Sequence, residues 1–475
     1  MEAESRAQVI VVGAGIAGLA TAYRIEEHLR AVGSAAQVRV LEAGARPGGK
    51  VQTVIQDGFV FEGGPNGFLD NEPATLRLID DLGLHHELLP SRELARRRFV
   101  IRNGRFHLLA THPFKFLTSS VLSLRGRLRV VAEMWTRPRR DDADESVAAF
   151  GRRRLGREFA DVLLDALVSG IHAGDPDALS LRAAFPKVHA LEREHGGLIR
   201  GMRARRKTAG GQKVEAGPSG VLHAFRGGME TPVKALAGKL GDRVMVRHSV
   251  QQVRSDGQRA FTVVASGPDG EATFEADAVV LATPAPATAG ALGSLDPDAA
   301  AALADVPIAG VHVVCQGYRR DQVHHPLDGF GALIPHVEGR PILGTLWSAA
   351  AFDGYAPDSH VQLRTLVGGS RNPGASDLDD DALVDLVRRE TRRDYGITGD
   401  AVATRVFRWP RGIPQYTVGH LGRMTRVRAA TDRLRGLFVT GNSVCGISFN
   451  HCVADAERTA LAVAVHLEKS GVRGP

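Results

Sequence analysis

The first forty residues pass from a short apolar run through a glycine turn into an amphipathic stretch. Residues 8–12 read Gln-Val-Ile-Val-Val and precede Gly13, a pattern typical of a buried strand that ends in a tight turn. From Ile16 to Ile25 the apolar residues return at helical spacing. A second short apolar run over 38–41 predicts another strand. Together these segments predict a βαβ unit with a right-handed crossover.

Two short apolar runs much later in the chain have the same character. Residues 277–282 and 436–440 are each bounded by turn residues and predict further buried strands. We therefore expect an α/β fold in which a Rossmann-like dinucleotide domain is discontinuous along the chain. The expected division is 1–90, 216–295 and 411–475 for this domain, 91–215 for a mainly helical basic insertion, and 296–410 for an α/β substrate domain dominated by a sheet.

The expected insertion contains segments of different character. Residues 144–168 have helical apolar spacing, whereas 200–220 is glycine-rich, basic and weakly apolar, which predicts a loop. A cluster of apolar residues could lie on a membrane or pack into the core, and core packing is the default for such side chains. Its members are Phe114, Phe116, Leu117, Val121, Leu122 and Leu124.

Length and composition are those of a globular protein. A chain of 475 residues with 43% hydrophobic residues is long enough for two or three domains. No stretch approaches the roughly 18 consecutive apolar residues needed to span a bilayer, so any membrane contact should be peripheral. The start of the sequence lacks a signal-peptide pattern, and we expect a cytoplasmic protein. Cys315, Cys445 and Cys452 match no metal-ligand spacing, so neither a metal nor a disulfide is expected.

The net charge of +7 is unevenly distributed. Residues 92–215 contain 26 Lys and Arg against 14 Asp and Glu, a local charge of +12, and the rest of the chain carries −5. This basic segment suits an anionic partner, such as a carboxylate-bearing substrate or anionic lipid at the cytoplasmic face of the inner membrane, or it is simply a solvated face. No nucleic-acid-binding motif accompanies the charge, so nucleic acid is not expected as a partner.

The glycine turn after the first strand carries the clearest chemistry. It is a GxGxxG fingerprint between strand and helix, which allows a tight turn, close approach of a pyrophosphate, and close helix packing. Glu42 ends the next strand and can accept hydrogen bonds from ribose hydroxyls. A glycine turn in an unrelated α/β protein is the alternative. The fingerprint residues are Gly13, Ala14, Gly15, Ile16, Ala17 and Gly18.

Two further glycine segments follow Glu42. Residues 43–50 read Ala-Gly-Ala-Arg-Pro-Gly-Gly-Lys, and residues 58–67 read Gly-Phe-Val-Phe-Glu-Gly-Gly-Pro-Asn-Gly. Both segments resemble the continuation of the FAD motif in the amine oxidase, phytoene desaturase and protoporphyrinogen oxidase flavoproteins. The resemblance implies that paired glycines let the backbone contact the pyrophosphate and the flavin ring. The further cofactor contacts that it implies are Ala43, Gly49, Lys50, Gly64, Pro65, Asn66, Gly67 and Val250.

The C-terminal segment agrees with this resemblance. Its glycine loop follows an apolar strand and precedes an apolar helix expected from Cys452 to Leu467, although it could be an ordinary βα turn. In the superfamily this helix start stabilises the anionic reduced flavin. No flavin-linking cysteine motif is present, so noncovalent FAD is expected. The loop residues implied in cofactor binding are Gly441, Asn442, Cys445, Gly446 and Ile447.

Two longer blocks are similar to the protoporphyrinogen oxidase branch. Residues 170–176 read Gly-Ile-His-Ala-Gly-Asp-Pro, and residues 408–416 read Arg-Trp-Pro-Arg-Gly-Ile-Pro-Gln-Tyr. The resemblance spans nearly the whole chain. It implies oxidation of protoporphyrinogen IX to protoporphyrin IX in heme biosynthesis, in which flavin accepts hydrides and oxygen reoxidises it to give hydrogen peroxide. Asn66, the implied catalytic residue, is uncharged and better suited to positioning than to proton abstraction.

The resemblance also assigns substrate contacts. Arg98 matches the segment in which the family places an arginine on a substrate propionate, and a guanidinium fork suits a carboxylate, although the neighbouring residues 96 and 97 are plausible alternatives. The backbone of Gly170 would face a pyrrole. Phe330 and Leu346 would line the macrocycle pocket or belong to the core. His172 replaces a residue that is often aromatic, and its role stays open.

Other functions remain open on the sequence alone. Coproporphyrinogen III oxidase is the nearest alternative because its four-propionate substrate suits a basic pocket, but residues 331–335 and the Arg-Trp-Pro block look closer to the protoporphyrinogen branch. An FAD-dependent amine oxidase comes third. A flavin-free escort protein of the same fold is opposed by the intact glycine motifs. The expected partners are a porphyrinogen and molecular oxygen, with a homodimer left open.

Overall fold

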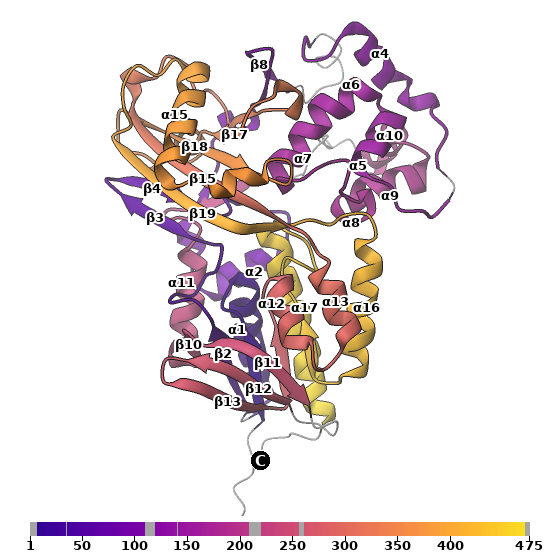
Figure 1. Cartoon of the computed structure of the whole chain (residues 1–475), viewed down its shortest axis with the longest axis vertical. Helices are drawn as coiled ribbons and strands as arrows, with labels where there is room; N and C mark the ends of the chain where they lie inside the picture. The colour runs from indigo at the N-terminus through magenta and orange to yellow at the C-terminus, as the bar shows by residue number, and fades with distance from the viewer. Residues whose placement is uncertain are drawn as a thin grey trace, which may run out of the picture.

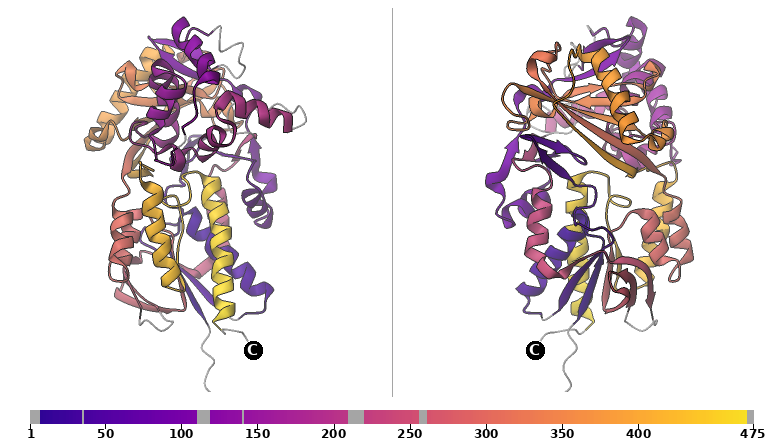
Figure 2. Two further views of the ribbon diagram at one scale, coloured as in Figure 1. Left: turned by 90° about the vertical axis from the view of Figure 1, so that its right-hand side faces the viewer. Right: turned by 60° about the vertical axis from the view of Figure 1, so that its left-hand side comes forward.

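The computed structural model describes residues 7–34, 36–109, 119–139, 141–208, 220–255 and 261–470. Figure 1 shows two stacked parts: a lower part built on a parallel sheet, and an upper part in which a second sheet lies beside a helical lobe. Figure 2 shows the long helix α17 (Phe449–Lys469) running along the lower part next to its sheet.

The lower part contains a five-stranded sheet in which every neighbouring pair is parallel. Segments from four distant stretches of sequence meet in it, as expected for a discontinuous dinucleotide domain. The predicted strands near 8–12, 38–41, 277–282 and 436–440 are all confirmed. In spatial order the strands are β10 (Val244–Val246), β2 (Gln37–Glu42), β1 (Gln8–Val12), β14 (Ala278–Leu281) and β20 (Leu437–Val439).

Both faces of this sheet are covered, which explains why its strands read as continuous apolar runs. In β1, Val9 and Val11 face a core formed with helices of one side, while Ile10 and Val12 face a second core. The first core includes α1 (Ile16–Ala31), α2 (Pro73–Asp81), α11 (Thr231–Leu240) and α17. The second includes α12 (Ala285–Leu292), α13 (Pro297–Ala304), α16 (His420–Arg433) and the antiparallel strands β11 (Ser249–Ser255), β12 (Phe261–Gly267) and β13 (Gly270–Ala276).

The upper part is built on a seven-stranded sheet that is antiparallel except where β16 runs parallel to β7. Helix α15 (Asp380–Tyr395) covers one face. On the other face the hairpin β3 (Thr53–Gln56) and β4 (Phe59–Glu62) inserts Phe59 and Phe61 against the sheet. The strand order is β19 (Ala403–Pro414), β15 (Ile308–Arg319), β18 (His360–Gly368), β17 (Ile342–Leu346), β16 (Gly331–Leu333), β7 (Arg98–Arg102) and β8 (Arg105–Leu108).

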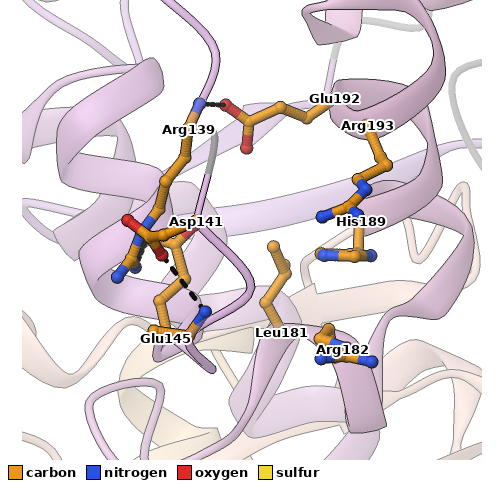
Figure 3. A pocket seen from close by; sticks show the side chains of 9 residues that line it. Arg139, Asp141, Glu145, Leu181, Arg182, His189, Glu192 and Arg193 are labelled. Carbon is orange, nitrogen blue, oxygen red and sulfur yellow. Dashed lines mark hydrogen bonds and ion pairs between the residues drawn. The ribbon is translucent and has the colours of Figure 1, made fainter.

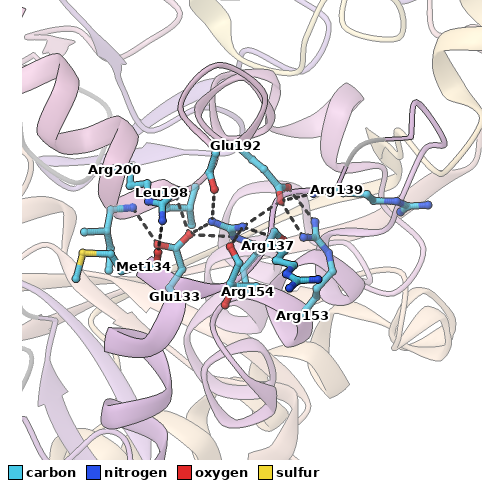
Figure 4. A network of polar contacts seen from close by, with 12 residues as sticks. Glu133, Met134, Arg137, Arg139, Arg153, Arg154, Glu192, Leu198 and Arg200 are labelled. Atoms are coloured by element: carbon cyan, nitrogen blue, oxygen red, sulfur yellow. Dashed lines mark hydrogen bonds and ion pairs between the residues drawn. The ribbon is translucent and has the colours of Figure 1, made fainter.

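The helical lobe has a charged centre (Figure 4). Arg154 and Glu133 are both fully buried and form an ion pair, and a second Glu133 oxygen accepts the backbone N–H of Ile199 at 3.1 Å. Glu192 pairs with Arg153 at 2.8 Å. Removing one partner of such a buried network usually costs about 3–5 kcal/mol. The lobe consists of α4 (Leu124–Val131), α5 (Val147–Arg154), α6 (Arg157–Phe159), α7 (Asp165–His172), α8 (Leu181–Ala184), α9 (Pro186–His195) and α10 (Leu198–Thr208), with a π-helical turn over Ala160–Leu164.

The structure corrects several expected boundaries. Strands β7 and β8 pair into the upper sheet, although the helical insertion was expected from residue 91, because Phe99 and Ile101 alternate into a sheet core. Strand β19 continues to Pro414, beyond the expected boundary at 410. Helix α10 occupies Leu198–Thr208 where a loop was predicted, and Glu133 accepts the N–H groups at its start.

The apolar cluster of the insertion is divided. Val121 and Leu122 are buried in a small core of the lobe, whereas Leu124 is 64% exposed. Phe114, Phe116 and Leu117 lie outside the described residues. Within the described part of the chain, no helix is both long and apolar enough to cross a bilayer.

Candidate functional site

The glycine fingerprint lies between β1 and α1 with the geometry that a dinucleotide requires. Gly13 has a φ of +100°, which favours glycine, and its N–H donates to the carbonyl of Leu41 at 2.7 Å. A Cβ on Gly18 would lie 1.9 Å from the carbonyl oxygen of Gly13. A Cβ on Gly15 would meet nothing within 4 Å. The surface at the start of α1 is therefore open, and its free N–H groups can face a phosphate.

Glu42 is fixed at the end of β2 beside this helix start. One carboxylate oxygen accepts the N–H of Ala14 at 2.8 Å, and the other accepts the N–H of Gly44 at 2.7 Å. A carboxylate has about four acceptor positions, so Glu42 keeps capacity for ribose hydroxyls. The N–H of His248 donates to the Glu42 carbonyl at 2.8 Å, which places the start of β11, and with it the predicted contact Val250, near the same end of the sheet.

Of the two other predicted glycine segments, residues 43–50 pack on the fingerprint and residues 63–67 pack on Lys50 of that first segment. The N–H of Gly48 donates to the carbonyl of Ala14 at 2.7 Å, and a Cβ on Gly49 would lie 3.5 Å from the Cα of Gly15. A Cβ on Gly64 would lie 1.9 Å from the carbonyl oxygen of Lys50, so only glycine permits this approach. Burial lowers the pKa of Lys50 to about 8. The structure thus brings these segments to one place.

The C-terminal loop between β20 and α17 reaches the same place. Gly441 has a φ of +102°, and a Cβ there would lie 3.7 Å from the Ala282 carbonyl oxygen and 3.9 Å from the Ala17 Cβ. The N–H groups of Val444 and Cys445 both donate to the Gly441 carbonyl. The predicted loop therefore lies beside the first turn of α1.

Asn66 has an amide group that is held from one side only. It is 9% exposed, and its Oδ1 accepts a hydrogen bond from the Ser348 hydroxyl at 3.0 Å. Its Nδ2 is buried and has no hydrogen-bond partner among the described residues. A buried donor without a partner is costly, which fits a bound molecule that accepts from it. Ser348, which the sequence analysis missed, begins α14 (Ser348–Ala351) and carries no local motif.

The upper sheet holds the segment before Asn66 by its carbonyl groups. Arg364, a buried residue of β18, donates to the carbonyl oxygens of Glu62 at 2.8 Å and Gly64 at 2.6 Å. The indole N–H of Trp409 donates to the carbonyl of Gly63 at 2.7 Å. Sequence reasoning missed Arg364, because an isolated arginine within a strand carries no signal. These contacts fix residues 62–64, which lead into the predicted cofactor-binding residues, against the upper sheet.

A row of neighbouring residues runs across the upper sheet from Arg364. Arg364, Leu346, Gly331 and Arg98 are direct neighbours on β18, β17, β16 and β7, so their side chains share one face. The guanidinium of Arg98 lies over the ring of Phe330, 5.7 Å from its centre. A Cβ on Gly331 would lie 2.4 Å from the carbonyl oxygen of Thr345 and 3.2 Å from a methyl group of Leu346, so Leu346 packs closely over this position. Three predicted substrate residues are therefore together on a face that leads to the cofactor segment.

The fourth predicted residue reaches the same face from the helical lobe. A Cβ on Gly170, in α7, would lie 2.6 Å from a methyl group of Leu333 on β16. Leu333 is two residues after Gly331 and so shares its side of the sheet. The absence of a side chain at Gly170 lets α7 approach the sheet closely. Leu333 is a further contact residue that the sequence analysis did not single out.

Three neighbouring positions make the following contacts. Arg97 forms an ion pair with Asp328, and Arg96 pairs with Glu93 at 3.3 Å. His172 packs edge-on against Phe185 inside the helical lobe, and burial lowers its pKa to about 4. His172 thus packs within the helical lobe, and no role is assigned to it.

A small pocket in the helical lobe is separate from this face (Figure 3). Arginines and acids both line it, and many of them bind each other. Arg139 pairs with Asp141 at 2.7 Å and lies 3.6 Å from Glu145, while Arg193 pairs with Asp142. Because its charges are mutually neutralised, this pocket offers little to a small charged ligand.

The parallel sheet, the glycine turn after β1 and Glu42 at the end of β2 together define a dinucleotide-binding protein. Its second domain, built on the upper sheet, packs against residues 62–64. The chain belongs to the flavin containing amine oxidoreductase family, whose model matches residues 16–466. It is therefore a flavoprotein oxidoreductase, and the predicted α/β fold and family resemblance are confirmed.

Named relatives align along nearly the whole chain. Coproporphyrinogen III oxidase of Bacillus subtilis (strain 168) is 29% identical, covering 97% of this chain and 98% of that protein. The chloroplastic protoporphyrinogen oxidase of Oryza sativa subsp. japonica is 31% identical, covering 98% and 89%. A crystal structure from Exiguobacterium sp. 255-15, assigned provisionally as a protoporphyrinogen oxidase, has a TM-score of 0.82 and 26% identity, covering 97% and 99%.

Proposed function

We propose that this protein oxidises protoporphyrinogen IX to protoporphyrin IX with noncovalently bound FAD and molecular oxygen. The observation that carries the proposal is the row formed by Arg98, Gly331 and Leu346, which leads across the upper sheet to the segment before Asn66. An arginine beside apolar side chains on one face suits a flat macrocycle that bears propionates. Relatives that carry the names of porphyrinogen oxidases support it.

The residues around the fingerprint suit the ADP half of FAD. The open start of α1 at Gly15 would receive the pyrophosphate, and Glu42 would accept from the ribose. The buried Nδ2 of Asn66 would donate to the bound flavin or to the substrate, holding their relative orientation. When bound, the flavin supplies the hydride-accepting chemistry.

Noncovalent attachment can be tested by denaturing the purified yellow protein and separating polypeptide from supernatant. We expect all of the FAD in the supernatant, because Cys445 and Cys452 do not lie in a flavin-linking motif. Flavin that stays with the precipitated polypeptide would contradict this expectation.

Coproporphyrinogen III is the second candidate substrate, and the full-length match to the Bacillus subtilis protein favours it. Four propionates require more cations than two. Arg97 is bound to Asp328, and Arg371, next to α7, is bound to Asp165. These pairs leave fewer arginines for a substrate, which supports the two-propionate porphyrinogen.

Competition between equal concentrations of the two porphyrinogens, mixed with the enzyme anaerobically, started by admitting oxygen and corrected for oxidation without enzyme, distinguishes the candidates by product analysis. We expect protoporphyrin to dominate. A dominant coproporphyrin product would transfer the proposal to the second substrate. Oxidation of neither porphyrinogen, with a simple amine oxidised instead, would refute both.

We also propose that the helical lobe makes weak contact with anionic membranes. Leu124 and Leu128 lie four residues apart on α4 and are 64% and 58% exposed, and Trp135 after the helix is 70% exposed. Residues four apart share a helix face, and this face belongs to the segment with a charge of +12. Apolar side chains among arginines suit a surface of anionic headgroups.

Vesicle cosedimentation at low and high salt tests the membrane proposal. We expect binding to anionic vesicles at low salt that weakens at high salt, and weaker binding by a Leu124→Ser, Leu128→Ser double variant. Equal binding to neutral and anionic vesicles, or no binding, would leave the basic segment as a solvated face.

A further inference from the structure

A residue distant in sequence closes the C-terminal loop beside the cofactor site. The hydroxyl of Tyr416 donates to the carbonyl oxygen of Asn442 at 2.6 Å and accepts from the N–H of Gly446 at 2.7 Å. One oxygen atom thus holds both ends of loop 442–446. Gly441, just before the loop, and Gly446, its last residue, have positive φ angles. Without the hydroxyl, two part-buried backbone groups would lose their partner.

The ring of Tyr416 is itself firmly packed. Tyr416 is 5% exposed, and its ring stacks on His420 with centres 4.1 Å apart and planes 13° apart. Burial lowers the pKa of His420 to about 4, so the imidazole is neutral and packs as a flat plate. Burial also raises the pKa of Tyr416, so its hydroxyl keeps the proton that it donates to Asn442.

The same short segment binds the helical lobe on its other side. The carbonyl oxygen of Tyr416 accepts the N–H of Ser180 at 2.8 Å. The side-chain amide of Gln415 donates to the carbonyl oxygen of His172 at 2.9 Å, at the last residue of α7. Helix α7 carries Gly170, which packs on the substrate face. Residues 415 and 416 therefore contact both the helix at the substrate face and the loop at the cofactor site.

We propose that Tyr416 is a positioning residue that holds loop 442–446 against the bound flavin and connects this loop to α7. The loop precedes α17, and the partial positive charge at a helix start acts over a short range. A shift of the loop therefore changes how strongly the protein stabilises negative charge on the flavin. This inference deepens the proposed function and rests on its flavin site, not on the choice of porphyrinogen.

The test is Tyr416→Phe, which removes one oxygen and keeps the ring. We expect about tenfold weaker FAD binding to the apoprotein, since the loss of two hydrogen bonds falls in this range. We also expect the oxidised holoenzyme to bind sulfite more weakly. Bleaching of the flavin absorption band measures this binding. Sulfite forms an anionic adduct with flavin, so the affinity for sulfite reports the positive charge near the flavin. A change in overall protein stability alone would not alter this affinity.

Tyr318→Phe is the matched control, because it removes another buried tyrosine hydroxyl, in the core of the upper sheet. Its FAD and sulfite affinities should equal those of the wild type. Unchanged affinities in Tyr416→Phe, or the same decrease in both variants, would overturn the proposal. Neither assay needs a porphyrinogen, so both remain informative if the proposed substrate is wrong.

Two further measurements test the proposal without Tyr416→Phe, in case that variant does not fold. In the wild-type holoenzyme, the Gly446 N–H should exchange with solvent as slowly as the N–H groups of α17, and rapid exchange would contradict the clamp. Gln415→Leu removes the hydrogen bond to His172. This variant should raise the KM for protoporphyrinogen about threefold and leave the FAD affinity unchanged. An unchanged KM would refute the connection to α7.

Discussion

Arg98→Ala tests the substrate face most directly. The guanidinium of Arg98 lies over the Phe330 ring at the edge of the row that leads to Arg364. A hydrogen bond to a charged group is worth about 1.5–3 kcal/mol. Arg98 is an exposed residue, so solvent should keep its contribution near the lower limit. About 1.5 kcal/mol corresponds to roughly a tenfold increase in KM.

The steady-state assay follows porphyrin fluorescence under air with purified protoporphyrinogen. Arg98→Ala should raise KM about tenfold and change kcat little, because a propionate lies away from the reacting carbon atoms. Arg98→Lys should recover only part of the loss, since an ammonium lacks the planar fork and stacks less well on Phe330. The flavin content of both variants should equal that of the wild type.

Arg96→Ala and Arg97→Ala are internal controls with the same change in charge. Arg97 is bound to Asp328 and Arg96 to Glu93, and partly exposed pairs of this kind usually contribute about 0–1 kcal/mol to stability. Their KM values should remain close to the wild-type value. A raised KM in either control with an unchanged KM in Arg98→Ala would assign the propionate contact to that neighbour. Unchanged KM values in all three alanine variants would mean that residues 96–98 form a surface patch without a substrate contact.

Three other variants test separate parts of the site. Gly15→Leu should yield folded protein with little FAD, because its side chain enters open space at the start of α1, and a normal ratio of flavin absorbance to protein would contradict the cofactor placement. Ser348→Ala removes the hydrogen bond that orients Asn66 and should lower kcat about two- to tenfold at unchanged FAD content, with partial recovery in Ser348→Thr; a wild-type kcat in Ser348→Ala would show that the bond is dispensable. Burial raises the pKa of Glu62 from 4.5 to about 7. The folded protein therefore binds this proton more tightly than the unfolded chain, and the resulting contribution to the free energy of unfolding is complete below pH 4.5 and is lost as pH rises through 7. Urea unfolding should therefore show a smaller decrease in the free energy of unfolding from pH 5 to 7 in Glu62→Gln than in the wild type, by at most about 3 kcal/mol, and equal slopes would refute the assignment.

The sequence predicted the dinucleotide domain well because its signals are local. A buried parallel strand is recognisable from a continuous apolar run, and the turn after it from glycines that no other residue can replace. Gly18 and Gly64 are such positions, since a Cβ at either would lie 1.9 Å from a carbonyl oxygen. The resemblance then provided Arg98 and Gly170, which the structure brings to one face of the upper sheet.

The boundaries and supporting contacts were not predictable in the same way. The start of β7 depends on its pairing with β16, more than 200 residues later, and α10 depends on Glu133, whose carboxylate accepts the N–H groups at its start. Ser348 acts by one hydrogen bond and Tyr416 by two, all to residues at least 26 positions away. No periodicity or motif marks such partners, because only the folded chain brings them together.

Long-range contacts of the same kind join the proposed cofactor region to the proposed substrate region. The segment from Glu62 to Gly64 leaves the hairpin strand β4, so its carbonyl groups need partners outside a regular strand. Arg364 and Trp409, about 300 residues later, supply them from the upper sheet. The direct neighbour of Arg364 in that sheet is Leu346 on the substrate face. Arg364, which holds residues 62–64, is therefore in register with Leu346 and Gly331, the positions where substrate contacts are proposed.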